Sequence, residues 1–411
     1  MRKFLTLLLS LIAVTSLSAY DFKVDHLTYS VLDRDYIGFI SIGDTANNVV
    51  RVTDADHDVI SVAIPAFVTH QGITYTVIEI AAEAFSDCNS LRSVIIPWSV
   101  VSVRPFSFSS CPSLSSIIVD SNNPRYDSRE NCNAIIETDR NMLVVACKGT
   151  TIPHSVIRIK EFAFAALDEY LHVTNRDHGI YYFDNCLICA RGLSYCVVKE
   201  GTRLIADAAF SKHDLDYQEY EDQGGYDVWS WYTFYDECLY REGRFYYYGV
   251  KVDAYSDWRA NSLRRVVIPN SVTSIGARAF AFTPLQQIAI PNSVTHIGEA
   301  AFGSCDSLVS VKLPNSVTSL KTYAFSECSH LQKVSIGDSI KTIEFGAFAG
   351  CTNLSDVHIG KGVTHIDVYA FSGCDSLKTL RIPNNVTTIS ERAIPEHTEI
   401  IFEQQIKDNI D

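Results

Sequence analysis

Three carboxylates at alternating positions are the first residues of this chain whose types and spacing could do chemistry. Asp54, Asp56 and Asp58 have the spacing with which a calcium-binding loop begins. Such a loop also needs a glycine at its sixth position and a glutamate at its twelfth, where this chain has Val59 and Pro65. A turn is therefore the better interpretation of this segment.

A pair of cysteines separated by two residues could bind zinc or take part in redox chemistry. Cys186 and Cys189 form this motif, but no second pair and no histidine at ligand spacing accompanies them. We interpret both as residues of a strand. The chain also has no nucleophile elbow, phosphate loop, zincin motif or dinucleotide fingerprint, and its twelve histidines are scattered. We therefore predict a protein that is not an enzyme and uses no cofactor and no bound metal.

Residues 211–262 concentrate aromatic side chains beside carboxylates. Tyr and Trp give a large contact area with a polar tip, so this insert could recognise a partner. The alternative is a long hairpin that packs as a lid on the rest of the fold. Its acidic residues could hold a cation, although an acidic surface loop explains them equally well. The candidate binding residues of the insert are Trp229, Trp231, Tyr232, Tyr246, Tyr247, Tyr248 and Trp258, and its acids include Asp214, Asp216, Glu219, Glu221 and Asp222.

Cysteines that recur every 23 residues show that the chain is built from repeats. Cys305, Cys328, Cys351 and Cys374 keep this interval. A residue that occurs once per coil stacks on its own copies, and cysteine packs well there as a small apolar side chain. We predict buried columns of reduced thiols, although the rung spacing of a parallel sheet is also compatible with a disulfide.

The repeat itself has the pattern LxxVxI(P/G)xSVTxIxxxAFxxC, of which residues 307–328 are an example. Self-similarity at this period predicts a solenoid, in which each coil buries its apolar side only against its neighbours. Leu308, Val311 and Leu313 predict a short strand, and Ala324 with Phe325 predicts a tight helical or 3-10 segment that closes the coil. A phenylalanine marks each coil at residues Phe85, Phe108, Phe164, Phe210, Phe280, Phe302, Phe325, Phe348 and Phe371, and Ile394 marks the last. Residues 126–148 and 182–198, and more weakly 234–250, predict hairpins inserted into coils.

The strand face is a second candidate binding surface, because residues between the buried strand positions project outward as one ladder. These residues are Arg265, Gln287, Lys312, Lys333, Asp356, His358, Thr379 and Arg381. The ladder is mildly basic, whereas the whole chain has a formal charge of −14. A solvated face without a ligand is the alternative interpretation.

The first residues predict export. Arg2 and Lys3 precede an apolar run from Phe4 to Leu17 and small residues at Ser18 and Ala19, which is typical of a secretory signal peptide. We found no other apolar run long enough to cross a membrane. The acidic mature chain would repel nucleic acid and anionic lipid. We expect a secreted or surface-exposed protein, with the periplasm as the alternative.

These patterns together predict six segments. They are a signal peptide at 1–19, a β-rich N-terminal cap at 20–80, repeats with hairpin inserts at 81–210, the acidic aromatic insert at 211–262, regular 23-residue repeats at 263–394, and a C-terminal cap at 395–411.

The coils IPNSVTSIGARAF and IPNSVTHIGEAAFGSC, the insert NCNAIIET and the start YDF resemble the BspA-like leucine-rich repeat family over roughly residues 60–400. The resemblance implies a right-handed coil of short parallel strands and helical or 3-10 turns between β-rich caps. It also implies a surface protein, because the family includes members that bind host matrix proteins, trigger Toll-like receptors or mediate coaggregation. We therefore expect protein binding or adhesion at the cell surface. The alternatives are a glycan-binding module that uses the insert, and an envelope scaffold without an external ligand.

Overall fold

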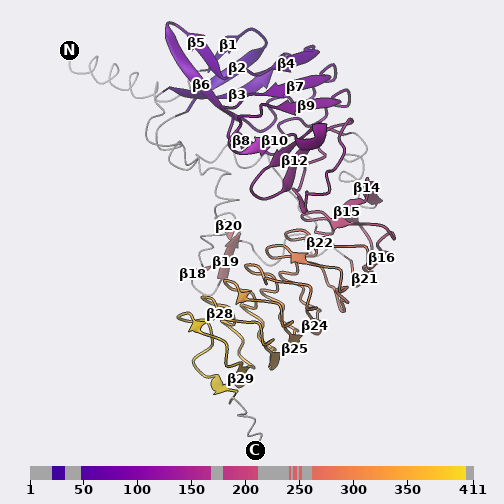
Figure 1. The fold of residues 1–411 in the computed structure, drawn as a ribbon, viewed down its shortest axis with the longest axis vertical. Coiled ribbons are helices and arrows are strands. Elements are labelled where there is room, and N and C mark those ends of the chain that lie inside the picture. Colours follow the sequence, from indigo (N-terminus) through magenta and orange to yellow (C-terminus); the bar gives the residue numbers. More distant parts are fainter. Residues whose placement is uncertain are drawn as a thin grey trace, which may run out of the picture. The chain divides into compact units, whose positions relative to one another are not determined.

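The structure is a computed structural model that describes residues 21–32, 48–167, 179–211 and 262–403, together with short strands at 240–241, 244–247 and 250–251. The chain divides into two compact units, residues 1–172 and residues 173–411. Each unit is described by itself below. The described residues are rich in short strands and contain a single short 3-10 helix, Arg129–Asn131, and no α-helix (Figure 1).

Unit 1 begins with a mixed sheet. Its strand order is β1-β2-β3-β6-β5, and β8 joins β6. The strands are β1 (Asp21–Val24), β2 (Leu27–Val31), β3 (Val49–Ala55), β5 (Phe67–His70), β6 (Ile73–Ile80) and β8 (Ser102–Val103). The pairs β3–β6 and β6–β8 are parallel and the others are antiparallel. The alternating segments predicted at the N-terminus are thus strands.

A three-stranded parallel ladder forms the first regular coils of unit 1. It contains β4 (Ser61–Ala63), β7 (Ser93–Ile96) and β9 (Ser116–Val119). A sheet of four strands follows, namely β10 (Tyr126–Asp127), β11 (Ala134–Glu137), β12 (Met142–Ala146) and β13 (Arg158–Ile159). Because β11 and β12 pair antiparallel, the hairpin predicted within residues 126–148 is confirmed.

Unit 2 opens with a second inserted hairpin. Strands β14 (Gly179–Phe183) and β15 (Cys186–Arg191) pair antiparallel, so the predicted hairpin is present but starts a few residues earlier than expected. A weaker third hairpin was predicted at 234–250. The strands there are β18 (Tyr240–Arg241), β19 (Arg244–Tyr247) and β20 (Val250–Lys251), and both successive pairs are antiparallel.

Two parallel ladders run through the coils of unit 2 on opposite sides of each coil (Figure 1). The front ladder contains β16 (Tyr195–Val197), β21 (Arg265–Val267), β24 (Ser310–Lys312), β25 (Lys333–Ser335), β27 (Asp356–His358), β29 (Thr379–Ile382) and β31 (Glu399–Phe402). The second contains β17 (Leu204–Ile205), β22 (Ser274–Ile275), β23 (His296–Ile297), β26 (Thr342–Ile343), β28 (His365–Ile366) and β30 (Thr388–Ile389). Residues at equal repeat positions pair, for example Val311 with Val334 and Val334 with Val357.

Columns of identical side chains fill the space between the ladders. The nine coil-marking phenylalanines are all buried. Their rings stack on one another, with centroids 5.0 Å apart for Phe302 and Phe325 and 5.7 Å apart for Phe325 and Phe348. A glycine is needed where coils approach most closely, since a Cβ on Gly337 would lie 2.7 Å from the Pro314 carbonyl oxygen. The predicted repeat columns are therefore the core.

The segments that close the coils differ from the prediction. We expected a helical or 3-10 segment around Ala324 and Phe325, but the described coils close through consecutive turns. The reason lies in the backbone: Tyr323 and Glu327 have left-handed φ angles of 56° and 57°, which interrupt a helix. The amides of Ala324 and Ser326 donate within the coil, while those of Tyr323, Phe325 and Glu327 donate to carbonyls of the next coil. The turns thereby add a third set of bonds between coils, and the handedness of the coil stays a prediction.

Candidate functional site

The front ladder of unit 2 carries five of the predicted binding residues. Lys312 lies on β24, Lys333 on β25, Asp356 and His358 on β27, and Arg381 on β29. All five side chains are exposed, because strand residues alternate and the intervening Val311, Val334 and Leu380 point into the core. The sequence-predicted ladder is therefore brought together on one face of unit 2.

The pairing register sorts these residues into two columns. Lys333 lies beside Asp356, and their Nζ and Oδ2 atoms are 2.5 Å apart in an ion pair whose side chains are 64% and 58% exposed. Ser335 lies beside His358 in the other column. Arg265 and Gln287 pair at the start of the ladder, and Thr379 pairs with Glu399 at its end. An ion pair this exposed contributes little to folding stability, so its charges are available to a partner.

The insert residues cannot be placed in the same way. Trp229, Trp231, Tyr232, Tyr248 and Trp258 lie outside the described residues, as do the acids Asp214, Asp216, Glu219, Glu221 and Asp222. Tyr246 and Tyr247 belong to β19, for which the structure describes the backbone alone. Recognition by the insert therefore stays a prediction.

Sequence reasoning missed an exposed position at the start of most front strands. In the front strands before β31, the residue that precedes the first outward residue is also exposed, as in Arg264 before Arg265 and Lys378 before Thr379. At the first of these rungs the Arg265 guanidinium lies 5.8 Å from the ring centroid of Tyr195, an exposed residue of β16. The sequence did contain a signal for this extra exposed position, because in most coils two polar residues directly precede the buried valine or leucine. The front face is thus three columns wide.

Sequence reasoning also missed an apolar face on unit 1. On the ladder β4–β7–β9, the outward residues Ala63, Ile95 and Ile118 pair with one another, and Ile95 and Ile118 are 45% and 50% exposed. Phe67 and Trp98 follow at the carboxyl ends of β4 and β7, with their rings edge to face and centroids 5.9 Å apart. Clustered exposed apolar side chains mark interaction sites more often than scattered ones. The sequence signal for this face was an isoleucine at the outward strand position where most other coils carry a polar residue.

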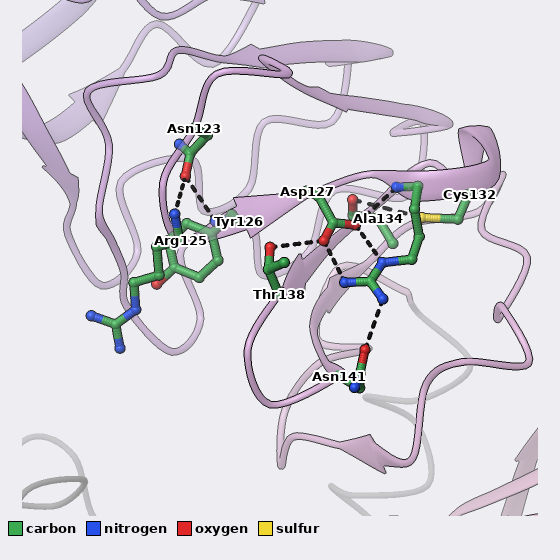
Figure 2. A network of polar contacts seen from close by, with 9 residues as sticks. Asn123, Arg125, Tyr126, Asp127, Cys132, Ala134, Thr138 and Asn141 are labelled. Atoms are coloured by element: carbon green, nitrogen blue, oxygen red, sulfur yellow. Dashed lines mark hydrogen bonds and ion pairs between the residues drawn. The ribbon is translucent and has the colours of Figure 1, made fainter.

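A network of polar contacts stabilises the hairpin insert of unit 1 and is not arranged to bind a ligand (Figure 2). Asp127 accepts hydrogen bonds from the side chain and backbone of Arg129 and from Thr138, and Arg129 also donates to Asn141 over 2.7 Å. Burial opposes ionisation of Asp127, but the hydrogen bonds from Arg129 and Thr138 outweigh it and lower its pKa. Both carboxylate oxygens are thereby used within the hairpin.

The recurring cysteines are buried in a column. Cys305, Cys328, Cys351 and Cys374 each donate a thiol hydrogen bond to the carbonyl of a phenylalanine about one coil earlier, at sulfur–oxygen distances of 3.1 to 3.3 Å. Burial raises the pKa of all four thiols. Protonated, inaccessible thiols are poor nucleophiles, so the column has a packing role. Its redox state stays a prediction that thiol labelling can check.

The remaining candidate metal ligands are bound within the fold. Asp56 forms an ion pair with Lys23 and a hydrogen bond with His26 just after the end of β3, in the turn predicted there. Cys186 and Cys189 are buried within β15. Among the residues that the structure describes, no group of three or more His, Cys, Asp or Glu side chains is arranged to hold a metal ion.

The sequence matches the BspA type leucine rich repeat region in six copies, over residues 67–137, 253–335 and 273–401. Because these matches cover more than half of the chain, the protein belongs to this family, as the repeat pattern predicted. Membership supports a protein-interaction module as the general function. No curated protein matches the chain.

Several solved bacterial structures are similar to the chain. A leucine-rich cell surface protein from Faecalibacterium prausnitzii is 23% identical, with 94% of this chain and 89% of that one covered and a TM-score of 0.30. A leucine-rich repeat protein from Eubacterium ventriosum is 14% identical, with 94% and 96% covered and a TM-score of 0.37. One from Bacteroides ovatus is 16% identical, with 94% and 100% covered and a TM-score of 0.28.

The described part of the chain also bears on membrane association. None of its helices has the length and apolar character needed to span a bilayer.

Proposed function

We propose that this protein is an exported, non-catalytic binding protein that holds another protein at the cell surface through the outward faces of its strand ladders. The observation that carries the proposal is the contrast between a uniform interior and two non-uniform outer faces. In unit 1 the face presents Ile95, Ile118 and Trp98, whereas in unit 2 it presents Lys312, Lys333 and Arg381. A face that contacts only solvent does not require exposed isoleucines.

The geometry of these faces suits a macromolecule better than a small ligand. Each ladder consists of short parallel strands, and those that pair through backbone bonds lie about 4.8 Å apart. Protein interfaces draw most of their energy from a few large aromatic or arginine anchors surrounded by weaker contacts. Trp98 and Phe67 supply such anchors in unit 1, and Arg265 and Arg381 supply them in unit 2. A rigid array of this kind binds by shape and charge without catalytic groups.

Export follows from the sequence rather than from the ladders. The predicted signal peptide at 1–19 would direct the chain out of the cytoplasm, and the family resemblance supports a surface location. Adhesion to a host or neighbouring cell is the specific form of binding that we propose. The periplasm is the alternative location.

A binding screen tests this function. The mature chain from residue 20 would be presented to arrays of matrix proteins and of polysaccharides, alongside three variants. The first carries Ile95→Ser, Trp98→Ala and Ile118→Ser, the second carries Lys312→Glu and Arg381→Glu, and the third has residues 213–256 replaced by a short Gly/Ser linker. We expect a protein ligand whose affinity falls about tenfold or more in the first or second variant, since anchor residues typically contribute 2 kcal/mol or more.

The third variant separates the ladders from the insert. Retained affinity in the linker variant supports recognition by the ladder faces. If the linker variant alone loses the ligand, recognition belongs to the aromatic insert with Trp229, Trp231 and Trp258. Binding to polysaccharides only would replace the protein-binding function with the glycan-binding alternative, and binding to neither class would leave the envelope scaffold.

A further inference from the structure

Positive charge is segregated onto the front face of unit 2. Residues 262–403 contain eleven Lys and Arg residues and twelve Asp and Glu residues, so this region as a whole is nearly neutral. The three exposed columns of the front face hold six of those cations but only two of the acids. The cations are Arg264, Arg265, Lys312, Lys333, Lys378 and Arg381, and the acids are Asp356 and Glu399. A chain with a formal charge of −14 therefore exposes a basic surface.

Three acids elsewhere in unit 2 make structural contacts. Glu344 pairs with Lys321 over 2.8 Å and also accepts a bond from the Thr322 amide. Asp338 accepts a hydrogen bond from the Lys361 amide, and Asp367 accepts one from the Val368 amide. The acids nearest to the front strands, Asp306 and Asp375, lie in the turns that precede β24 and β29. Of the front-face cations, Lys333 pairs with Asp356 and Lys378 donates to the Asp375 carbonyl oxygen, and the face as a whole keeps an excess of positive charge.

Many uncharged residues of the front face are hydrogen-bonding groups, and the exposed valines Val197, Val267 and Val309 lie among them. Gln286, Gln287, Ser310, Gln332, Ser355 and Thr379 are exposed between the cations. Amides and hydroxyls donate to carboxylates as well as to peptide groups. The exposed aromatic ring at the first strand of this face, that of Tyr195, already lies against Arg265, and Phe402 is exposed at the last strand. The cations and hydrogen-bonding groups between these two ends suit an anionic partner.

We propose that the front face of unit 2 binds a protein partner through a carboxylate-rich surface. This inference rests on the proposed function and names its partner class. Arg265 and Arg381 can each bind a carboxylate through two parallel hydrogen bonds. Lys312 and Lys378 act as point charges. Complementary charge of this kind steers association and selects the partner.

The Lys333–Asp356 ion pair favours a protein over a simple polyanion as the partner of this face. Asp356 is 58% exposed within the face, so a polyanion that carries a charge at every unit would meet a repelling carboxylate there. A protein surface can place a lysine or an amide opposite Asp356 and carboxylates opposite its neighbours. The overall acidity of the chain further disfavours sulfated glycans and nucleic acid, which carry dense charge.

The test uses a fluorescent peptide of alternating Glu and Ser as the probe, with the mature chain as the receptor. A Gln/Ser peptide of the same length and a heparin oligosaccharide are the comparison ligands. The front-face variant carries Lys312→Glu and Arg381→Glu. The matched variant carries Lys341→Glu and Lys361→Glu, which are exposed outside the front face and make the same change in net charge. Circular dichroism of both variants checks that they are folded.

We expect the Glu/Ser peptide to bind the unaltered chain, more weakly as salt rises, and to lose about tenfold in affinity in the front-face variant. The matched variant should change by less than about twofold, because its charges lie on other faces. Equal losses in both variants, or equal binding of the Gln/Ser peptide, would overturn the inference. Preference for heparin over the Glu/Ser peptide would overturn it in favour of a sulfated polyanion.

The failure of this inference is distinguishable from failure of the proposed function. A matrix-protein ligand found in the screen that binds the front-face variant as well as the unaltered chain overturns the basic face as its site. The protein-binding function then stands, with its site on unit 1 or on the insert, and the other two variants of the screen distinguish these.

Discussion

The outer faces of two ladders in this molecule differ, although the coils behind them are built alike. In unit 1 the ladder β4–β7–β9 presents Ile95 and Ile118, and in unit 2 the ladder β24–β25–β27 presents Lys333, Asp356 and His358. Both have a valine or isoleucine column on the inner side of the same strands. The comparison teaches that a repeated core leaves outward positions free to vary. An outward side chain does not contact the core, and it contacts only the coils next to its own.

The interiors are nearly interchangeable. Phe85 and Phe108 stack in unit 1 with centroids 4.9 Å apart and rings 10° from parallel, and Phe302 and Phe325 stack in unit 2 at 5.0 Å and 6°. Cys111 and Cys328 donate thiol hydrogen bonds to the equivalent phenylalanine carbonyls. Differences in binding between the two units should therefore arise from the outer faces and not from the core.

The largest expected effect is at the core. Phe325→Ala should lower the free energy of unfolding by about 3 to 5 kcal/mol, because it empties a packed aromatic site between two stacked rings. Phe108→Ala should cost a similar amount in unit 1. Urea titrations followed by circular dichroism measure both. A loss at one position several times that at the other would show that the two interiors are not equivalent.

The second-largest expected effect is a decrease in the folding stability of unit 2 as the pH rises. Burial and then the charge of Asp306 raise the pKa of Glu327 from 4.5 to about 7, so the folded state holds a proton that the unfolded chain has released. Stability should be full below about pH 4.5 and fall by about 1 to 3 kcal/mol as the pH rises to about 7.

Glu327→Gln should remove this decline, since the amide does not ionise. Asp306→Asn, which removes the weaker cause, should reduce it only in part. Urea titrations at several pH values between 4 and 8 would measure the slope, and a Glu327→Gln variant with an unchanged slope would refute the assignment.

The sequence predicted those features of the fold that depend on repetition. Equal spacing of Phe and Cys requires stacked columns, so the strands and the core followed from it, and the three inserted hairpins were predicted from segments that interrupt the repeat. The turns did not follow, because left-handed φ angles at Tyr323 and Glu327 arise from bonds to the next coil that no local pattern records. Of the candidate site, the columns of Lys312 and Lys333 were predicted. Arg264, Lys378 and the face around Ile95 were missed, because their exposure depends on how the coil enters and leaves each strand.

The smallest expected effect concerns the stability contributed by the outward residues themselves. Lys333→Ala removes an ion pair whose partners are both more than half exposed, and such pairs contribute little net free energy because solvent screens them. Ile95→Ser removes an apolar side chain that is 45% exposed on a strand whose inner face is unchanged. Both substitutions should alter the free energy of unfolding by about 0.5 kcal/mol or less. Measured beside Phe325→Ala, a loss of several kcal/mol at Lys333 would contradict the assigned register, because it would place this side chain in the core. A comparable loss at Ile95 alone would show that the apolar face of unit 1 is covered within the folded chain, and would exclude it as a binding surface.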